Sequence, residues 1–211
     1  MQKLLNKSIY IFDFDGVLVD SVKIKTQSFA LIYKIYGKEV VNKVINHHIE
    51  NGGMSRFDKF KFYHKNFLNI DLNKNDLEIL NLKFSALVKN KVINAPEIPG
   101  ATKYLFELNK NKRVYVNSAT PENELLEIIN QRRWSNYFID ILGSPKTKTE
   151  NIQFIVDQEK LDLKKFVFFG DAINDYKAAK NIGIDFVQLK SNKDELIGNP
   201  IFSVNSFEEL I

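Results

Sequence analysis

Short apolar runs, each followed by polar residues, constrain the fold of this 211-residue chain more than any other feature. One run lies near the N-terminus, and five more alternate with helix-like segments after Pro99 and Gly100. These runs cover residues 9–12, 114–117, 139–142, 166–169, 184–189 and 201–204. Strands that alternate with helices form a parallel sheet with helices on both faces. The sequence therefore predicts an α/β fold whose core is a three-layer parallel sheet.

The segment at residues 22–95 has helical periodicity instead. Four amphipathic stretches are separated by glycines and by a serine suited to cap a helix, and they cover residues 22–36, 38–50, 55–67 and 76–90. Phe57, Phe60, Tyr63 and Phe67 recur at the spacing of one helix face, which favours a helical core over a ligand-stacking surface. We therefore expect an all-helical domain at 22–95, inserted into a core made of 1–21 and 96–211.

Composition excludes several classes of protein. The chain has no cysteine, so disulfides, thiolate metal sites and cysteine catalysis are excluded, and a cytoplasmic location is expected. No stretch approaches the roughly 18 consecutive apolar residues of a membrane helix. We expect no membrane association.

Charge is unevenly distributed. Residues 22–95 hold thirteen lysines and arginines against six aspartates and glutamates, a net charge of +7, whereas the rest of the chain has a net charge of −3. An anion held between a basic and an acidic part fits this asymmetry. The sequence pI is about 9.0, but the basic residues form no dense run and match no nucleic-acid-binding module, so we expect no nucleic acid partner.

A pair of carboxylates closes the first apolar run. Asp13 and Asp15 are two residues apart and lead directly into Gly16. Alternate residues of a strand point to the same side, so the two carboxylates would repel unless a cation or a proton lay between them. The glycine allows the chain to curl around a ligand of these carboxylates. The pair indicates a functional site, although a solvated turn is the simpler interpretation of these four residues alone.

Polar residues also follow the later runs, and ligands of parallel sheets bind at this edge. Ser118 and Thr120 follow the second run, where Thr120 is placed to cap a helix opened by Pro121, a start suited to an anion. Asp171 and Asp175 follow the fourth run and would share one side of a helix start. Their oxygens suit a hard cation such as Mg²⁺.

These elements, in this order, resemble the haloacid dehalogenase (HAD) superfamily of phosphotransferases. The resemblance rests on the 13–21 motif DFDGVLVDS, on Ser118, on Lys148 and on the Gly170-Asp171-X3-Asp175 element. It spans nearly the whole chain and implies a Rossmann-like core. The inserted helices resemble the C1-type cap of the subgroup that contains phosphoglycolate phosphatase and β-phosphoglucomutase.

The resemblance implies a role for each site residue. Asp13 would attack phosphorus and become an aspartyl phosphate, and Asp15 would be the acid and then the base. The Asp13 carboxylate, the Asp15 backbone carbonyl and Asp171 would hold Mg²⁺, with Asp175 orienting this metal site. In the same way Ser118 and the Ala119 N–H would bind phosphoryl oxygens, and Lys148 would offset the charge around Asp13. Lys146 is the alternative lysine, two residues away.

The sequence leaves the roles of four residues in the cap region open. Arg56, in a loop similar to that of the β-phosphoglucomutase group, would contact a distal phosphate of the substrate, although capping explains the neighbouring Ser55. Lys25 is either a polar residue over the site or a solvated helix residue. At least one of His47 and His48 is expected at the surface.

The resemblance implies a Mg²⁺-dependent phosphatase of a small phosphorylated metabolite, a sugar phosphate or a phosphorylated organic acid. Because phosphonatases of this superfamily have no acid at the position of Asp15, that residue favours phosphate esters. The alternatives are a phosphomutase and, less favoured, a non-catalytic phosphate-binding protein. The expected oligomeric state is a monomer or a weak dimer.

Overall fold

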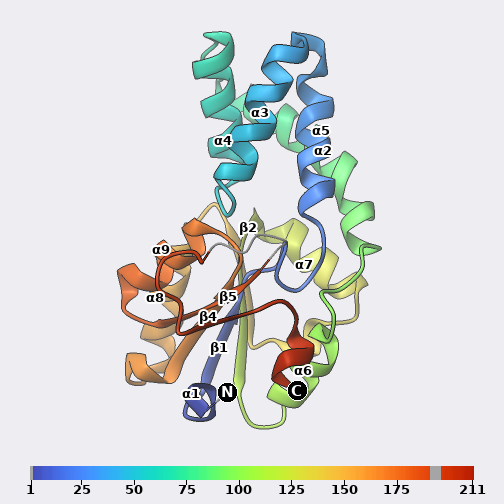
Figure 1. Ribbon diagram of the computed structural model, residues 1–211. Helices are drawn as coiled ribbons and strands as arrows, with labels where there is room; N and C mark the ends of the chain where they lie inside the picture. The colour runs from blue at the N-terminus through green and yellow to red at the C-terminus, as the bar shows by residue number, and fades with distance from the viewer. Residues whose placement is uncertain (1, 191–195) are drawn as a thin grey trace.

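A six-stranded parallel sheet forms the centre of the molecule in the computed structural model, which describes residues 2–190 and 196–211 (Figure 1). The strands are ordered β3-β2-β1-β4-β5-β6, so β1 lies in the middle with β2 on one side and β4 on the other. Their bounds are Ile9–Phe12 (β1), Arg113–Pro121 (β2), Asp140–Ser144 (β3), Phe166–Gly170 (β4), Asp185–Leu189 (β5) and Phe202–Val204 (β6). Each of the six predicted runs is a strand.

Helices cover both faces of the sheet. Alternate residues of β1 divide between two apolar clusters: Tyr10 and Phe12 pack with α6 and α7, whereas Ile9 and Ile11 pack with α8 and α9. These helices span Ala101–Leu108 (α6), Glu122–Gln131 (α7), Lys148–Glu159 (α8) and Ile173–Ile182 (α9). The predicted three-layer α/β core is confirmed.

The described part of the chain also contains short helical segments around this core. They span Gln2–Leu5 (α1), Ser135–Tyr137 (η3), Leu163–Lys165 (η4) and Phe207–Leu210 (η5). Phe207, at the start of η5, is fully buried and packs edge-on against Phe12 of β1. The end of the chain thus completes the apolar layer beside α6.

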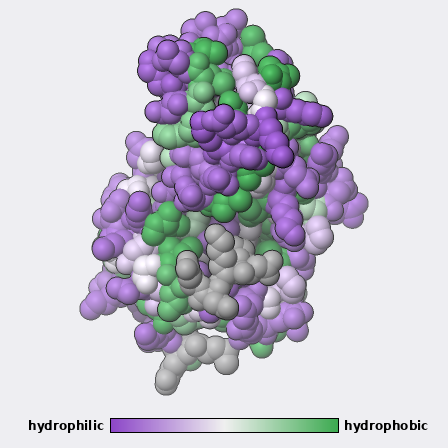
Figure 2. All heavy atoms as spheres, turned by 45° about the horizontal axis from the view of Figure 1, so that its top comes forward, coloured by the Kyte–Doolittle hydropathy of each residue, from purple (hydrophilic) through white to green (hydrophobic). Residues whose placement is uncertain are grey.

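The segment between β1 and α6 is helical and stands beyond one edge of the sheet (Figure 1). It contains Val22–Tyr33 (α2), Lys34–Tyr36 (η1), Lys38–Glu50 (α3), Arg56–Tyr63 (α4), His64–Leu68 (η2) and Lys74–Ile93 (α5). Figure 2 shows hydrophilic residues over much of its visible face, with hydrophobic ones between them. We call α2 to α5 the cap. The domain boundaries at residues 22 and 95 stay a prediction.

The cap has an aromatic core. Phe60 and Tyr63 of α4 are fully buried against Phe29 of α2, and Phe67 packs at the border of this cluster. Phe57, the remaining residue of the predicted stripe, is half-buried and lies outside the cluster. Among the described residues, no helix combines the length and the apolar character that a membrane crossing requires.

The structure corrects the prediction for Thr120. Strand β2 continues to Pro121, four residues beyond the predicted run, and Pro121 itself occupies the N-cap position of α7. Thr120 therefore does not cap that helix. Its hydroxyl donates instead to Asp15 Oδ2 at 3.0 Å, and this bond turns the side chain toward the edge of the sheet where the carboxylates lie.

Candidate active site

Strands β1 and β4 are neighbours, and this pairing brings the predicted carboxylates together. Phe12 lies opposite Phe169, and the Asp13 N–H donates to the Phe169 carbonyl at 2.9 Å. The residues that follow both strands therefore meet at one edge of the sheet. Asp13, Asp171 and Asp175 each place one carboxylate oxygen within 4.8 Å of the others. Asp175 is fixed there because its Oδ2 accepts from the Asp171 N–H at 3.2 Å and the Ala172 N–H at 3.1 Å.

Lys148 is the cation of this carboxylate cluster. It is the first residue of α8, and its Nζ lies 2.9 Å from Asp13 Oδ1 and also contacts Asp175. Lys146 is exposed, and its Nζ lies 5.2 Å from the ring centre of Phe154. Of the two lysines that the sequence left open, the structure places Lys148 beside the carboxylates.

The charge balance of the cluster suits a divalent cation. The pKa of Asp13 is raised to about 7, chiefly by burial and also by the nearby Asp175 and Asp15, against the opposing effect of Lys148. Burial and the charges of Asp13 and Asp175 likewise hold the pKa of Asp171 well above its usual value. One lysine thus contacts two buried carboxylates, and the half-buried Asp171 lies beside them. The negative charge of these carboxylates exceeds the positive charge of the lysine. Carboxylate oxygens of this kind are the ligands that Mg²⁺ prefers.

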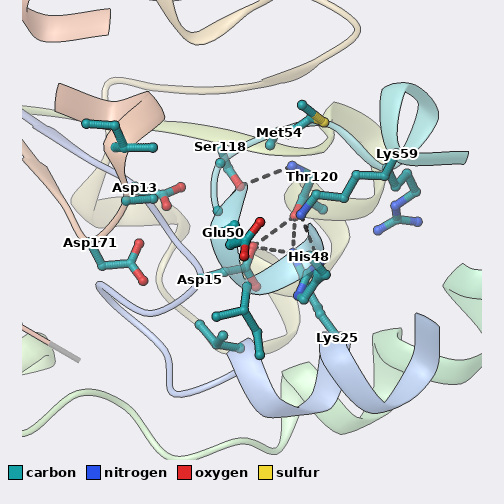
Figure 3. Close-up of a pocket in the computed structure, with 18 of the residues that line it drawn as sticks. Asp13, Asp15, Lys25, His48, Glu50, Met54, Lys59, Ser118, Thr120 and Asp171 are labelled. Atoms are coloured by element: carbon teal, nitrogen blue, oxygen red, sulfur yellow. Dashed lines mark hydrogen bonds and ion pairs between the residues drawn. The ribbon is translucent and has the colours of Figure 1, made fainter. Parts of the chain in front are cut away.

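Asp15 lies in a separate hydrogen-bond network (Figure 3). Its Oδ1 accepts from the Ser21 hydroxyl at 2.6 Å, and its Oδ2 accepts from Thr120 and pairs with Lys25. Burial alone would raise the pKa of Asp15, but the charge and hydrogen bonds of Lys25, with those from Ser21 and Thr120, hold it below its usual value. Lys25 is therefore a polar residue of the site, and the interpretation as a solvated helix residue is wrong.

Gly16 allows the turn that follows these aspartates. Its φ of +83° is in the region that favours glycine, and a Cβ at this position would overlap the Asp171 carboxylate. A larger residue would therefore displace either the turn or Asp171.

A cavity of about 390 Å³ lies between the sheet edge and the cap. Ser118 and Ala119 line it together with Asp13, Asp15, Lys148 and Asp171, so the predicted phosphate-binding residues face the carboxylates. The cap closes the other side, where the Gly52 carbonyl accepts a hydrogen bond from Asn174 Nδ2 at 2.6 Å. The cavity is large enough for a small metabolite.

Arg56 lines the same cavity, but its guanidinium is bound by the protein. Nη1 and Nη2 donate to the two carboxylate oxygens of Glu124 in α7 at 2.8 and 2.5 Å, and Nη1 also donates to Ser85 at 2.8 Å. Ser55 is the N-cap of α4, as expected, and accepts from the Asp58 N–H at 3.2 Å. Contact between Arg56 and substrate stays a prediction.

The structure corrects the expectation of a surface histidine before this loop. His48 is buried in the cavity wall, and its Nδ1 lies 2.8 Å from Nζ of Lys59, while His47 is half-buried and stacks on Phe62. Sequence reasoning also missed Lys59 and Glu124. Lys59 lies one turn after Arg56 on the buried side of α4, but nothing in the sequence distinguishes that side from a purely structural one.

Comparison with known families identifies the chain. The family model described as haloacid dehalogenase-like hydrolase matches residues 10–189, which include every predicted site residue. The chain belongs to this family. A comparison with curated protein sequences gave no significant match.

Solved structures share the fold over nearly the whole chain. A predicted phosphoglycolate phosphatase from Haemophilus somnus (18% identity, TM-score 0.74) covers 97% of this chain and 96% of its own. A putative phosphatase from Clostridium difficile (25% identity, TM-score 0.70) covers 97% of both chains. A putative β-phosphoglucomutase from Bacteroides vulgatus (16% identity, TM-score 0.79) covers 97% of this chain and 86% of its own. The predicted family is confirmed.

Proposed function

We propose that this protein is a Mg²⁺-dependent phosphatase of a small phosphorylated metabolite. The observation that carries the proposal is the placement of Asp13, Lys148 and Asp171 around one cavity, which Asp15 also lines while paired with Lys25. That arrangement supplies one carboxylate to attack phosphorus and a second to transfer protons. Two solved structures of this fold, described as a predicted and a putative phosphatase, support the same reaction.

The proposed reaction has two displacements. In the first, an Asp13 carboxylate oxygen bonds to phosphorus, the ester P–O bond breaks, and the leaving alcohol takes a proton from Asp15. In the second, water gives its proton to Asp15 and bonds to phosphorus, the P–O bond to Asp13 breaks, and phosphate leaves. Lys25, Ser21 and Thr120 favour ionised Asp15, which is the base of the second displacement. The first displacement requires Asp15 to have taken up a proton.

The other site residues bind charge. Lys148 balances the charge that gathers around Asp13, while Ser118 and the Ala119 N–H bind phosphoryl oxygens. Mg²⁺ would be held by the Asp13 carboxylate, the Asp15 carbonyl and Asp171, with Asp175 in support, and would supply positive charge to the phosphoryl group. A cytoplasmic location and a monomer or weak dimer stay predictions.

The test is phosphate release from a panel of phosphorylated metabolites by the wild type and the Asp13→Asn variant, with Mg²⁺ and with a chelator. Release that depends on the metal and is lost in the variant supports the proposal. Conversion of a hexose 1-phosphate to the 6-phosphate without free phosphate would favour the phosphomutase instead.

A further inference from the structure

One cation of the cavity differs from the others in its partners. Lys25 pairs with Asp15, Arg56 with Glu124, and Lys148 with Asp13 and Asp175. Lys59 lines the same cavity, yet within residues 2–190 and 196–211 its ammonium has no carboxylate partner.

Lys59 is also deeply buried. Its exposed fraction is 3%, and its Nζ lies 5.7 Å from the ring centre of Phe29. A buried charge without an opposite charge is unfavourable and is normally paired or neutralised. The pKa of Lys59 is lowered to about 7, chiefly by burial and also by the positive charges of Lys25 and Lys148, against the opposing charges of Asp15 and Asp171. An anion beside Lys59 would restore its charge.

The hydrogen bonds of Lys59 leave donors for a ligand. A lysine ammonium has three N–H groups. One is directed to His48 Nδ1, and His48 is neutral because burial, with the charges of Lys59 and Lys25, lowers its pKa to about 2. Among the described residues, no protein atom accepts a hydrogen bond from the other two N–H groups. The hydrogen bond to His48 therefore orients the ammonium and leaves two N–H groups to bind a ligand.

Lys59 lies away from Asp13 and Asp171 (Figure 3). In Figure 3, Asp13 and Asp171 are on one side of the pocket, whereas Lys59 and His48 are on the other, with Ser118 and Asp15 between them. A ligand that placed its transferred phosphate at Asp13 would extend toward Lys59 with its opposite end.

We propose that Lys59, oriented by His48, binds a second anionic group of the substrate, a carboxylate or a second phosphate, at the cap end of the cavity. The proposal rests on the proposed function and narrows its substrate class to phosphate monoesters that carry another acid. Because Arg56 is bound by Glu124, the specificity for this group is assigned to the lysine one turn later.

Binding to variants that cannot turn over tests the proposal separately from catalysis. On the Asp13→Asn background, calorimetry would compare 2-phosphoglycolate with 2-hydroxyethyl phosphate, and glucose 1,6-bisphosphate with glucose 6-phosphate. With Lys59 intact, we expect tighter binding of the acid-bearing member of one pair, and that pair shows whether the group is a carboxylate or a phosphate. Lys59→Met should reduce this preference by about 10- to 100-fold, a typical effect of removing one charged hydrogen bond.

Two further variants complete the design. Lys59→Arg keeps the charge and should keep part of the preference, while Lys61→Met, at an exposed position of the same helix, should leave it within about twofold. The proposal is overturned if the Asp13→Asn protein with Lys59 intact prefers neither acid-bearing ester, or if the added Lys59→Met substitution retains the preference. Acid-dependent binding without turnover by the wild type would refute the phosphatase and leave this site standing.

Discussion

Arg56 in the cap and Glu124 in the core form a buried ion pair with two hydrogen bonds. The residues are 68 positions apart in the chain and are only 4% and 8% exposed. The guanidinium also stacks on Phe84 of α5, 4.6 Å from the ring centre. The pair and this stacking therefore connect α4 and α5 of the cap to α7 of the core.

Loss of Arg56 should destabilise the protein. Arg56→Ala leaves the Glu124 carboxylate buried without its partner, and breaking such a pair costs about 3 kcal/mol or more of the free energy of unfolding. Lys89→Ala is a matched control because Lys89 pairs with Glu127 across the same α5–α7 contact, but with 35% and 49% of the side chains exposed. It should cost less than about 1 kcal/mol. Urea unfolding measures both; equal costs would contradict the proposed role of the pair.

Glu124 should make stability depend on acid. Burial would raise its pKa, but Arg56 and Ser85 hold it below the usual 4.5. Because the folded pKa is lower than the unfolded one, the contribution of Glu124 is present above pH 4.5 and is lost as pH falls through the folded value. The free energy of unfolding of Glu124→Gln should therefore decrease less between about pH 6 and pH 3 than that of the wild type. An identical decrease in both proteins would refute this linkage.

The two candidate lysines should differ sharply in activity. Lys148→Ala removes the cation beside Asp13 and should lower kcat by about 100-fold or more, the usual cost of removing a charge-stabilising group. Lys146→Ala, at an exposed position over Phe154, should retain wild-type kcat. Steady-state kinetics on one phosphate ester checks both, and a larger loss in Lys146→Ala would reverse the assignment.

Lys25 should act through Asp15. Lys25→Met removes the ion pair that orients this carboxylate, together with the hydrogen bond to Thr120 at 2.7 Å, and should lower kcat by about tenfold. Lys23→Met, exposed on the same helix, serves as the control. If Lys25→Met changed KM and left kcat unaltered, a direct contact with the substrate would replace the positioning role.

The sequence predicts the fold well because each strand is a short apolar run between polar residues. The family resemblance implies that Asp13 and Asp171 meet, and they do so in the structure because β1 and β4 are adjacent parallel strands whose carboxyl ends lie at one edge of the sheet. The sequence prediction fails at the end of β2, where Thr120 looks like a helix cap but lies in an extended, buried segment.

The cavity wall on the cap side could not be predicted. His48 and Lys59 meet only when α3 packs against α4, and Glu124 meets Arg56 only when the cap packs on the core. Such contacts join surfaces of separate elements, and no spacing along the chain encodes them. A lysine at position 59 has the same local sequence signature whether it faces solvent or a ligand.

The most direct test of the proposed phosphatase is phosphate release by the wild type and by Asp13→Asn, each with Mg²⁺ and with a chelator. We expect the wild type with Mg²⁺ to release phosphate from at least one ester, and that release to be lost with the chelator or in the variant. Turnover that persists in Asp13→Asn would contradict the assignment of Asp13 as the nucleophile, and turnover unaffected by the chelator would contradict the metal site.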